Sequence, residues 1–416
     1  MTPHPLIVEA EEAQPDKLRQ LFRETFRQEP EGIFRAPGRI NLIGEHVDYN
    51  AGRCMPMALE HSTFLIARRR SDGLLRATTR LSDSGLSRIP APVTVPLNGL
   101  TPERLSLPVE AGWARYVIGV LWALIGQGHE DVAAGMDLLV VGNIPLGAGL
   151  SSSAALTCST ALACSELFGL GLSDDHGRTV LAQAAVTAEN EMAGAATGGM
   201  DQAISLRGSA GHLMLLDCQD FSTRQIPFDA DGAGLSVLVI DTQAPHRLVD
   251  GQYAERRSTC ERAAASLGLS SLREAHGKPV DEVLAGLHDD VSIRRTRHVL
   301  SEMDRVDACE RLLDEHPLNE IADRIGELIS GSHRSLRDDY QVSCPELDTA
   351  VDAAMSAGAL GARMIGGGFG GSAIALIRRT QLDDVVQAVS DGFVRHRFTE
   401  PRFLLARPAD GARRLA

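Results

Sequence analysis

"MDLLVVGNIPLGAGLSSSAALTCSTALACSELFGL", residues Met136 to Leu170, joins three kinds of sequence in one segment. It begins with an apolar run that is typical of a buried strand, passes through a glycine-rich loop, and ends in small and apolar residues that predict a helix. The glycines remove side chains, so backbone N–H groups can converge on an anion. Ser151, Ser152 and Ser153 stand where the helix should begin, and free N–H groups and the helix dipole favour a phosphate there. The segment therefore predicts a strand, a phosphate-binding loop and a helix.

The same loop also has a simpler interpretation, as a glycine and serine turn that only caps a buried helix. The three serines could cap the helix, donate to phosphate oxygens, or offer an oxygen to Mg²⁺. The loop is not a Walker A loop, because that motif requires a lysine that this stretch lacks. Taken alone, the loop leaves both interpretations open.

The length and the charge of the chain limit what it can be. A chain of 416 residues is too long for one compact core, so we expect two domains. Residues 221–234 are polar and turn-rich and precede an apolar strand pattern at residues 235–243, so we divide the chain into residues 1–225 and 235–416. The net charge of −14 argues against binding to nucleic acid or to an anionic membrane. It does not argue against an anionic substrate, because a small site needs only a local positive potential.

The remaining composition points to a reducing compartment. The seven cysteines are scattered and form no C-x-x-C pair, which is typical of reduced thiols. The first residues lack a basic stretch followed by an apolar one, and no segment has the apolar length of a membrane span, so we expect a cytoplasmic protein. Only Lys17 and Lys278 are lysines, so a phosphate site must use arginine, helix ends or a metal.

Local patterns predict several further elements. Apolar residues at helical spacing predict helices over residues 15–28 and 113–125. Residues 33–43 contain apolar runs broken by "APGR", which predicts two strands joined by a turn. Ser173 is the expected N-cap of the helix that follows it. We expect the second half to be mostly helical through residue 355.

A second glycine run, "GGGFGG" at residues 366–371, formally fits G-x-G-x-x-G. A strand pattern, "SAIALI", follows it, whereas a dinucleotide-binding fingerprint must open a helix, so the context excludes that interpretation. A tight turn or a close backbone approach to a ligand remains. Five glycines in six residues cost folding entropy, which favours the ligand.

"GRINLIGEHVDYN", Gly38 to Asn50, places Arg39, Glu45, His46 and Asp48 beside an apolar run. Burying these groups without partners would cost several kcal/mol, so something must satisfy them. A sugar does so well, because its hydroxyls donate to carboxylates and accept from histidine. The alternative is a surface cluster of salt bridges on a turn.

Two further acids are candidates for chemistry. Asp201, in "GGMDQ", could deprotonate a hydroxyl nucleophile, although an isolated aspartate there more often caps a helix. Glu189, near the end of its predicted helix, could bind Mg²⁺ or simply be solvated.

Three motifs in this order resemble those of the GHMP kinase superfamily and, within it, of the galactokinase family. They are "GRINLIGEHVDYNAG" for the sugar, "NIPLGAGLSSSAAL" for ATP, and "RMIGGGFGGSAIAL" as the third, glycine-rich motif. The stretches "YAERRSTCE", "SHRSLRDDYQVSCPELD" and "ARPADGARRL" agree with the same family. The resemblance extends from about Arg35 to Leu415, and the motifs together are specific.

The resemblance implies an α+β, two-domain GHMP kinase fold. Its N-terminal domain is similar to ribosomal protein S5, its C-terminal domain is a ferredoxin-like α/β sandwich, and the active site lies in the cleft between them. The implied catalytic pair is Arg39 and Asp201, with Asp201 as the base. The implied substrate contacts are Arg39, Glu45, His46, Asp48, Gly198, Asp201 and Tyr253.

The resemblance also implies a site for MgATP. Ser153 and Glu189 would contact Mg²⁺, and Trp113 would lie near the adenine or, equally well, in the core. The implied nucleotide contacts are Trp113, Pro145, Gly147, Ala148, Gly149, Leu150, Ser151, Ser152 and Ser153.

The sequence departs from the family pattern at several positions. Val47 replaces a usual threonine, Ile365 replaces the threonine before the third glycine run, and "TGGMDQ" replaces the commoner "CGIMDQ". "DTQAPH", residues 241–246, replaces an asparagine-rich stretch, which puts the family's sugar contacts there in doubt. We expect these changes to affect the choice of sugar and not the reaction.

The leading functional hypothesis is an ATP-dependent galactokinase that makes α-D-galactose 1-phosphate and ADP, the first committed step of galactose catabolism in the Leloir pathway. A second is a related anomeric kinase of N-acetylgalactosamine or L-arabinose. A third is a non-catalytic sensor of galactose and ATP, but such sensors lose part of the "SSSAA" stretch that is intact here. The expected partners are D-galactose and MgATP, without nucleic acid or membrane, and we expect a monomer.

Overall fold

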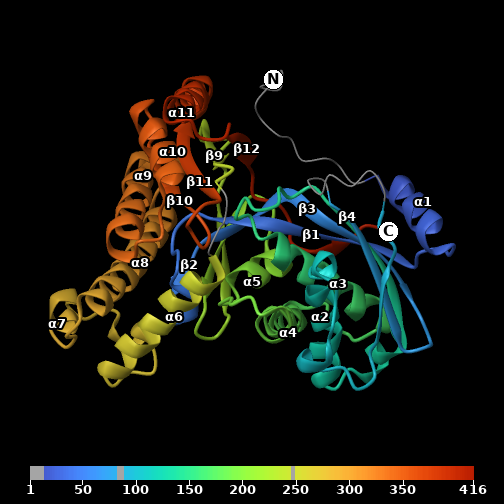
Figure 1. Ribbon diagram of the computed structural model, residues 1–416. Coiled ribbons are helices and arrows are strands. Elements are labelled where there is room, and N and C mark those ends of the chain that lie inside the picture. Colours follow the sequence, from blue (N-terminus) through green and yellow to red (C-terminus); the bar gives the residue numbers. More distant parts are fainter. Residues whose placement is uncertain (1–13, 82–88, 245–248) are drawn as a thin grey trace.

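The computed structural model describes residues 14–81, 89–244 and 249–416. Helices pack on three β-sheets, which gives the α+β architecture that the resemblance implied (Figure 1). Within these residues no helix combines the length and the apolar character that a bilayer crossing requires.

The first sheet has six strands in the order β13-β1-β3-β6-β4-β5. β4 and β6 run parallel, with α2 (Ala114–Gly126) in the connection between them, while the other neighbours are antiparallel. β13, near the chain end, pairs with β1, so the C-terminus returns to the sheet that the N-terminal half builds (Figure 1). The strands are β1 (Gly32–Asn41), β3 (Pro56–Arg69), β4 (Leu74–Leu81), β5 (Val93–Pro96), β6 (Gly135–Gly142) and β13 (Arg413–Arg414).

Alternating residues of this sheet enter two different cores, as the two-residue period of a strand requires. Phe34 and Leu65 join a large cluster with α2 and α3 (Ser152–Phe168), and these helices and α4 (Asp175–Thr187) lie on one side of β1 and β3 (Figure 1). Ile33 and Ile66 instead contact α1 (Pro15–Phe26), whose Leu18, Phe22 and Phe26 are buried. The helices predicted over residues 15–28 and 113–125 are confirmed as α1 and α2.

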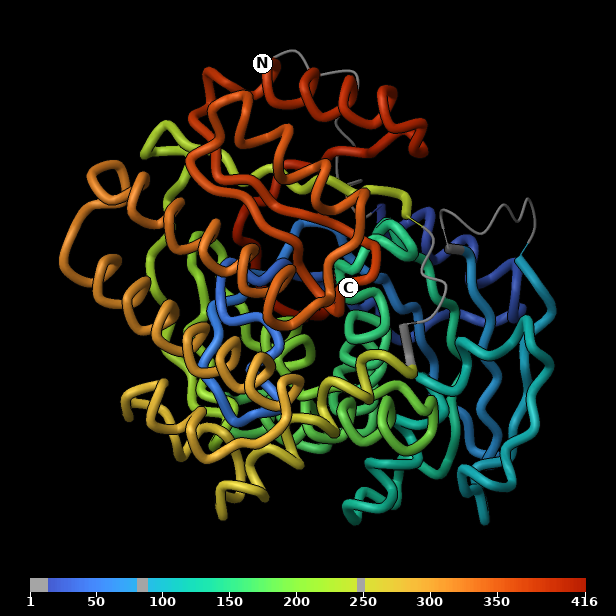
Figure 2. The backbone as a smooth tube through the Cα atoms, turned by 60° about the vertical axis from the view of Figure 1, so that its left-hand side comes forward, coloured from blue at the N-terminus to red at the C-terminus, as the bar shows by residue number. Residues whose placement is uncertain are grey.

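A second, four-stranded sheet follows in the second half of the chain, in the order β10-β11-β9-β12 and antiparallel throughout. Its strands are β9 (Leu235–Asp241), β10 (Gly361–Met364), β11 (Ser372–Arg378) and β12 (Arg402–Ala406). The helices of this half are α6 (Val249–Ser266), α7 (Val280–Leu284), α8 (Asp290–Glu315), α9 (Leu318–Ser335), α10 (Pro345–Ser356) and α11 (Leu382–His396). Figure 2 shows α8 and α9 at the opposite side of the molecule from β4 and β5.

Smaller elements complete the described chain. A three-stranded sheet contains β2 (Arg53–Cys54), β7 (His212–Asp217) and β8 (Thr223–Pro227). Short helix α5 (Met200–Arg207) follows the π-helical turn Ala188–Ala193, and a second π-helical turn, Leu336–Tyr340, extends α9. Single 3₁₀ turns cover Asp48–Asn50, Pro102–Arg104, Val109–Ala111, Glu130–Ala134, Leu272–Ala275 and Arg379–Gln381.

Two expectations about local structure were wrong. Residues 32–41 form one strand and not two, because the chain absorbs Pro37 and Gly38 as a shift of register against β3 and continues. A Cβ on Gly38 would lie 2.5 Å from the carbonyl oxygen of Leu150, so the glycine serves a close approach and not a turn. The N-cap of α4 is Asp174, whose side chain accepts from the N–H of Gly177, and not Ser173.

Candidate active site

A cavity of about 150 Å³ brings together eight of the seventeen predicted site residues, from six separate segments. Its lining comes from β1 and the turn after it, the start of α3, the π-helical turn at Ala188–Ala193 with the loop that follows it, α5, α6 and the second glycine run. The predicted residues in the lining are Arg39, Glu45, His46, Asp48, Ser153, Glu189, Asp201 and Tyr253, and Ala195, Ala196, Thr197, Met200, Gly366 and Gly367 complete it. Ala195, Ala196, Thr197 and Met200 were not named from the sequence, whereas Gly366 and Gly367 belong to the glycine run for which the sequence favoured an approach to a ligand.

An ion pair between Arg39 and Asp201 lies in this cavity. Arg39, on β1, donates from Nε and Nη2 to the two carboxylate oxygens of Asp201, at 2.8 and 3.0 Å. Arg39 is buried, which opposes its charge, but Asp201, Glu45 and Asp48 outweigh burial and raise the pKa of the guanidinium. Asp201 is in the first turn of α5, so its carboxylate also lies at the positive end of a helix.

The phosphate loop forms hydrogen bonds with both members of this ion pair. Arg39 donates from Nη1 to the carbonyl oxygen of Gly149 at 2.6 Å, and its backbone N–H donates to Leu150. Ser151 donates from its hydroxyl to Asp201 Oδ2 at 2.5 Å, a contact that the sequence did not reveal. Ser151 occupies the N-cap of α3 with φ near 58° and makes no side-chain capping bond, so its side chain serves Asp201 and not the helix.

The second glycine run packs against the phosphate loop from the other side. The run connects β10 and β11, and Ser372 donates from its hydroxyl to the carbonyl oxygen of Ala148 at 2.6 Å. Gly149 and Gly371 are neighbours: a Cβ on Gly149 would lie 3.9 Å from the Cα of Gly371, an ordinary van der Waals contact. Of the predicted nucleotide contacts in this loop, Ser153 lines the cavity, whereas the others do not: Pro145, Gly147, Ala148, Gly149, Leu150, Ser151 and Ser152.

Glu45 is a buried carboxylate held by a buried arginine. Arg363, on β10, is fully buried and donates from Nη2 to Glu45 Oε2 at 2.5 Å. Burial raises the pKa of Glu45, while Arg363 and Arg39 oppose that rise. Arg363 was missed in the sequence, although an arginine inside the apolar strand "GARMI" is a signal that a buried acid must face it.

His46 and Asp48 follow in the same segment. His46 Nδ1 shares a hydrogen bond of 2.8 Å with the hydroxyl of Tyr49, and burial lowers the pKa of His46 well below its usual value, so the ring is neutral. Its Nε2 is buried and forms no hydrogen bond of normal geometry with a described residue. Burial, followed by the charges of Asp201 and Glu45, raises the pKa of Asp48 to about 7. These groups leave hydrogen-bonding capacity for a polar ligand.

Gly198 and Tyr253 complete the predicted substrate contacts in different ways. Gly198 does not line the cavity, but a Cβ there would lie 2.3 Å from Asp48 Oδ2, so only glycine lets that carboxylate take its place. The ring of Tyr253, on α6, lies with its centroid 5.5 Å from that of His46. Tyr253 thus closes the cavity on the side of the histidine.

Glu189 offers a second, separate carboxylate in the cavity. It accepts from Gln202 Nε2 at 2.7 Å and from the hydroxyl of Thr157 at 3.1 Å, and burial raises its pKa to about 7. The hydroxyl of Ser153 is also a hydrogen-bonding neighbour of this carboxylate. The described residues contain no group of three or more histidine, cysteine or acidic side chains that could hold a metal, so an ion here would need ligands from a substrate or water.

Trp113, a predicted nucleotide contact, and the described part of the divergent "DTQAPH" stretch do not line the cavity. Trp113, directly before α2, packs against the core cluster of the first sheet, which is the core alternative named for it. Thr242, in the "DTQAPH" stretch, donates from its N–H and hydroxyl to the carbonyl oxygen of Gly371, at 3.0 and 2.6 Å. Residues 241–244 therefore support the second glycine run and do not line the cavity, while residues 245 and 246 lie outside the described part.

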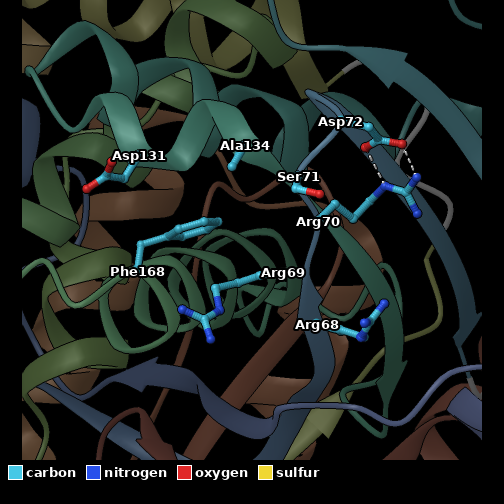
Figure 3. Close-up of a pocket in the computed structure, with 8 residues that line it drawn as sticks. All are labelled: Arg68, Arg69, Arg70, Ser71, Asp72, Asp131, Ala134 and Phe168. Carbon is cyan, nitrogen blue, oxygen red and sulfur yellow. Dashed lines mark hydrogen bonds and ion pairs between the residues drawn. The ribbon is translucent and has the colours of Figure 1, made fainter.

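A larger cavity of about 610 Å³ lies elsewhere, at the end of β3 and near α3 (Figure 3). Two of its three arginines already have partners: Arg70 pairs with Asp72 and with Asp137, and Arg69 pairs with Glu31 at 2.9 Å. The cavity contains none of the predicted site residues. Its size alone therefore does not make it the active site.

Comparisons with known proteins match several segments of the chain to one family. The galactokinase galactose-binding signature matches residues 20–69, the GHMP kinase N-terminal domain matches residues 115–209, and the GHMP kinase C-terminal domain matches residues 318–395. The chain is 44% identical to a galactokinase of Streptomyces coelicolor over 95% of this chain and 97% of the relative. It is 39% identical to the galactokinase of Canis lupus familiaris, over 95% of each chain.

Solved structures agree with these matches. The structure is similar to that of the Lactococcus lactis galactokinase complexed with galactose, with a TM-score of 0.86 and 30% identity over 96% of this chain and 99% of the other. The mevalonate kinase of Methanococcus jannaschii shares the fold at a TM-score of 0.61 and 16% identity, over 91% and 98% of the two chains.

Proposed function

The chain belongs to the galactokinase family of the GHMP kinases, and we propose that it transfers the γ-phosphoryl group of ATP to the C1 hydroxyl of α-D-galactose. It is an ATP-dependent sugar kinase, and its products are ADP and α-D-galactose 1-phosphate. The observation that carries the proposal is the Arg39–Asp201 pair, which lies in one cavity with Glu45, His46, Asp48 and Tyr253 and beside a glycine-rich phosphate loop.

The polar groups of the cavity suit a sugar. Glu45 and Asp48 supply carboxylate oxygens that accept from hydroxyls, and neutral His46 supplies a ring nitrogen. Gly198 keeps Asp48 in place, and Tyr253 supplies a ring against the apolar side of a pyranose. A set of fixed polar groups of this kind favours a substrate with hydroxyls at matching positions, because each missing hydroxyl would leave a buried group without a partner.

Asp201 acts as the general base in the proposed reaction. Among the described residues, Oδ1 accepts only from Arg39 Nε, so one lone pair remains for the C1 hydroxyl. Asp201 takes the proton of that hydroxyl as its oxygen forms a bond to the γ-phosphorus. The bond from the γ-phosphorus to the bridging oxygen breaks, and ADP leaves with the electron pair.

Arg39 has two tasks in this reaction. Its bidentate bond holds the carboxylate of Asp201 in a fixed orientation, and its positive charge would stabilise the negative charge that develops on the transferred group. Its bond to Gly149 fixes the phosphate loop relative to the base. The base and the phosphate donor are therefore positioned by one side chain, which favours attack in line.

The residues present fit a Mg²⁺ ion that accompanies ATP. Ser153 and Glu189 offer a hydroxyl and a carboxylate, the hard oxygen donors that Mg²⁺ prefers, and within the described part of the chain the buried Glu189 has no cationic side chain among its hydrogen-bond partners. When bound, the ion would neutralise charge on the phosphates. Trp113 remains a proposed neighbour of the adenine, although its surroundings favour a core role.

We also keep the division into residues 1–225 and 235–416, a monomeric state and a cytoplasmic location as proposals. All seven cysteines are free, and six of them are buried, which fits a reducing compartment.

A panel of free monosaccharides in a coupled ADP assay tests the proposed function. The panel contains D-galactose, N-acetylgalactosamine, L-arabinose and D-glucose, and phosphorus NMR of the product identifies the phosphorylated hydroxyl. We expect Mg²⁺-dependent turnover with galactose, with one anomeric phosphate formed for each ADP. Turnover with only N-acetylgalactosamine or L-arabinose would show that this sugar, and not galactose, is the substrate. Binding of galactose without ADP formation would favour a non-catalytic sensor of galactose and ATP.

A further inference from the structure

The turn that carries Glu45 and His46 has an unusual backbone. It follows β1, and Gly44 and His46 adopt φ angles of 92° and 61°. Glycine adopts such angles freely, whereas for histidine they cost on the order of 1 kcal/mol, so the surroundings must hold the turn in place. Both side chains that the turn presents line the proposed sugar site.

Helix α8 holds this turn with two side chains that lie one helical turn apart. Glu302 Oε1 accepts from the backbone N–H groups of Gly44 and Glu45, at 2.9 and 3.1 Å. His298 Nε2 is 3.0 Å from the carbonyl oxygen of Glu45. A carbonyl only accepts, so His298 carries a proton on Nε2, and its Nδ1 lies 2.9 Å from the hydroxyl oxygen of Ser335. Burial lowers the pKa of His298 to about 4, which agrees with a neutral ring.

The side chain of Glu45 is tied to the same helix through Arg363. Arg363 Nη2 donates to Glu45 Oε2, and Nη1 lies 3.6 Å from Glu302 Oε1. Ser332 links the pair, because its hydroxyl accepts from Arg363 Nη1 at 3.1 Å and donates to Glu302 Oε1 at 2.7 Å. Both the backbone and the carboxylate of Glu45 therefore depend on Glu302.

Glu302 is itself an ionised group in the core. Its relative exposure is 0%, and burial would raise its pKa, but the charges of Arg305 and Arg363 and the hydrogen bond from Ser332 outweigh burial and lower the pKa to about 2. Arg305 donates from Nε to Glu302 Oε2 at 2.7 Å. A buried charge with this many donors is a costly arrangement to keep, and apolar residues could fill the same space. Glu302, His298, Arg363 and Ser332 do not line the cavity, so none of them can replace Glu45 as a contact.

We propose that Glu302 is a positioning residue for sugar recognition: through the N–H groups of Gly44 and Glu45 and through Arg363, it fixes the orientation in which Glu45 and His46 meet the sugar. This inference rests on the proposed function of the cavity. According to this inference, helix α8 in the second half of the chain orients the sugar-binding residues Glu45 and His46 in the first half. The phosphate loop makes no contact with Glu302 among the described residues, so the effect is confined to the sugar.

The substitution Glu302→Gln tests this role, because it keeps the size of the side chain and removes the charge. We expect the KM for galactose to rise at least about ten-fold and the KM for ATP to stay within about two-fold, since a displacement of about 1 Å at a site can cost that much. The matched control is Glu310→Gln on the same helix, where the carboxylate accepts from Arg53 and Arg224 at 2.8 and 2.7 Å. Both KM values should be unchanged in the control.

A second variant, Ser332→Ala, removes one hydroxyl that donates to Glu302 and is a smaller change. We expect it to raise the galactose KM by roughly two- to five-fold, again without an effect on ATP. If Glu302→Gln does not fold, Ser332→Ala decides the question. Parental galactose KM values together with a reduced active fraction would mean that Glu302 only stabilises the fold and would overturn the inference. Absence of galactose turnover in the parent would instead contradict the proposed function.

Discussion

Arg39 and Asp201 are 162 positions apart in the sequence, and the guanidinium of the first donates to both carboxylate oxygens of the second, at 2.8 and 3.0 Å. This one bidentate contact joins the end of β1 to the first turn of α5. The third donor of Arg39 reaches Gly149 in the phosphate loop, so the contact also fixes the distance from the base to the loop. The arrangement makes the roles of both residues separable by experiment.

Asp201→Asn should lower kcat by about 100- to 10,000-fold and change the galactose Kd by less than about three-fold. The amide keeps the shape of the side chain and can still meet a hydroxyl, but it cannot take a proton. Steady-state kinetics give kcat, and calorimetry gives the galactose Kd.

The matched control for that variant is Asp175→Asn, which breaks a similar bidentate pair with Arg207 outside the cavity, at 2.8 and 2.6 Å. Its kcat should stay near the parental value. Equal losses of turnover and of galactose binding in Asp201→Asn would show that Asp201 anchors the sugar and is not the base.

Arg39→Lys should lower kcat by about 100-fold, because a single ammonium cannot hold both oxygens of Asp201 and the carbonyl of Gly149 together. Kinetics at saturating galactose and ATP measure the effect. Arg207→Lys, which changes the corresponding pair with Asp175, is the control and should keep parental turnover. An Arg39→Lys variant with full kcat would mean that charge alone suffices and that the fork geometry has no role.

Asp48→Asn should change how stability depends on pH in the protein without ligands. The pKa of Asp48 is raised to about 7 by burial and by Asp201 and Glu45. A carboxyl with a raised pKa favours folding fully below its ordinary pKa, and this contribution is lost as the pH rises through about 7. Relative to the parent, Asp48→Asn should therefore gain about 2 to 3 kcal/mol in free energy of unfolding between about pH 5 and about pH 8. Urea denaturation at both pH values measures it, and a constant difference would contradict the raised pKa.

Glu189→Gln should raise the Mg²⁺ concentration for half-maximal turnover by at least about ten-fold, because the amide is a poor ligand for a hard cation. Galactose binding, measured by calorimetry without nucleotide, should not change. Glu191→Gln is the matched control, since Glu191 belongs to the same π-helical turn and is exposed. An unaltered Mg²⁺ requirement in Glu189→Gln would remove Glu189 from the metal site.

Much of the fold was predictable from local patterns. The strand, loop and helix between Met136 and Leu170 appear as expected, because apolar periodicity and glycine content are properties of the segment itself. The break predicted at "APGR" failed because proline and glycine also occur in a register shift, and only the neighbouring strand β3 and the loop at Leu150 show which applies. For the same reason the N-cap of α4 was predicted one residue too early, at Ser173 and not at Asp174.

The site was predictable where residues belong to a motif and not where they meet only in three dimensions. Arg39, Glu45, His46 and Asp48 share one short stretch, whereas Glu302 is 258 positions from Gly44, whose N–H it accepts. Glu302 stands in a long helix rich in charged residues, where a solvated acid is the ordinary interpretation. The contact of Ser151 with Asp201 was not predicted for the same reason, since a serine at the start of a helix usually caps that helix.

The most direct test of the account is a crystal structure of the protein with D-galactose and a non-hydrolysable ATP analogue. We expect the C1 oxygen of the sugar about 3 Å from a carboxylate oxygen of Asp201, with that oxygen in line with the γ-phosphorus and the bridging atom of the analogue. A sugar that presents another hydroxyl to Asp201, or that binds outside the cavity between Arg39 and Tyr253, would contradict the central claim.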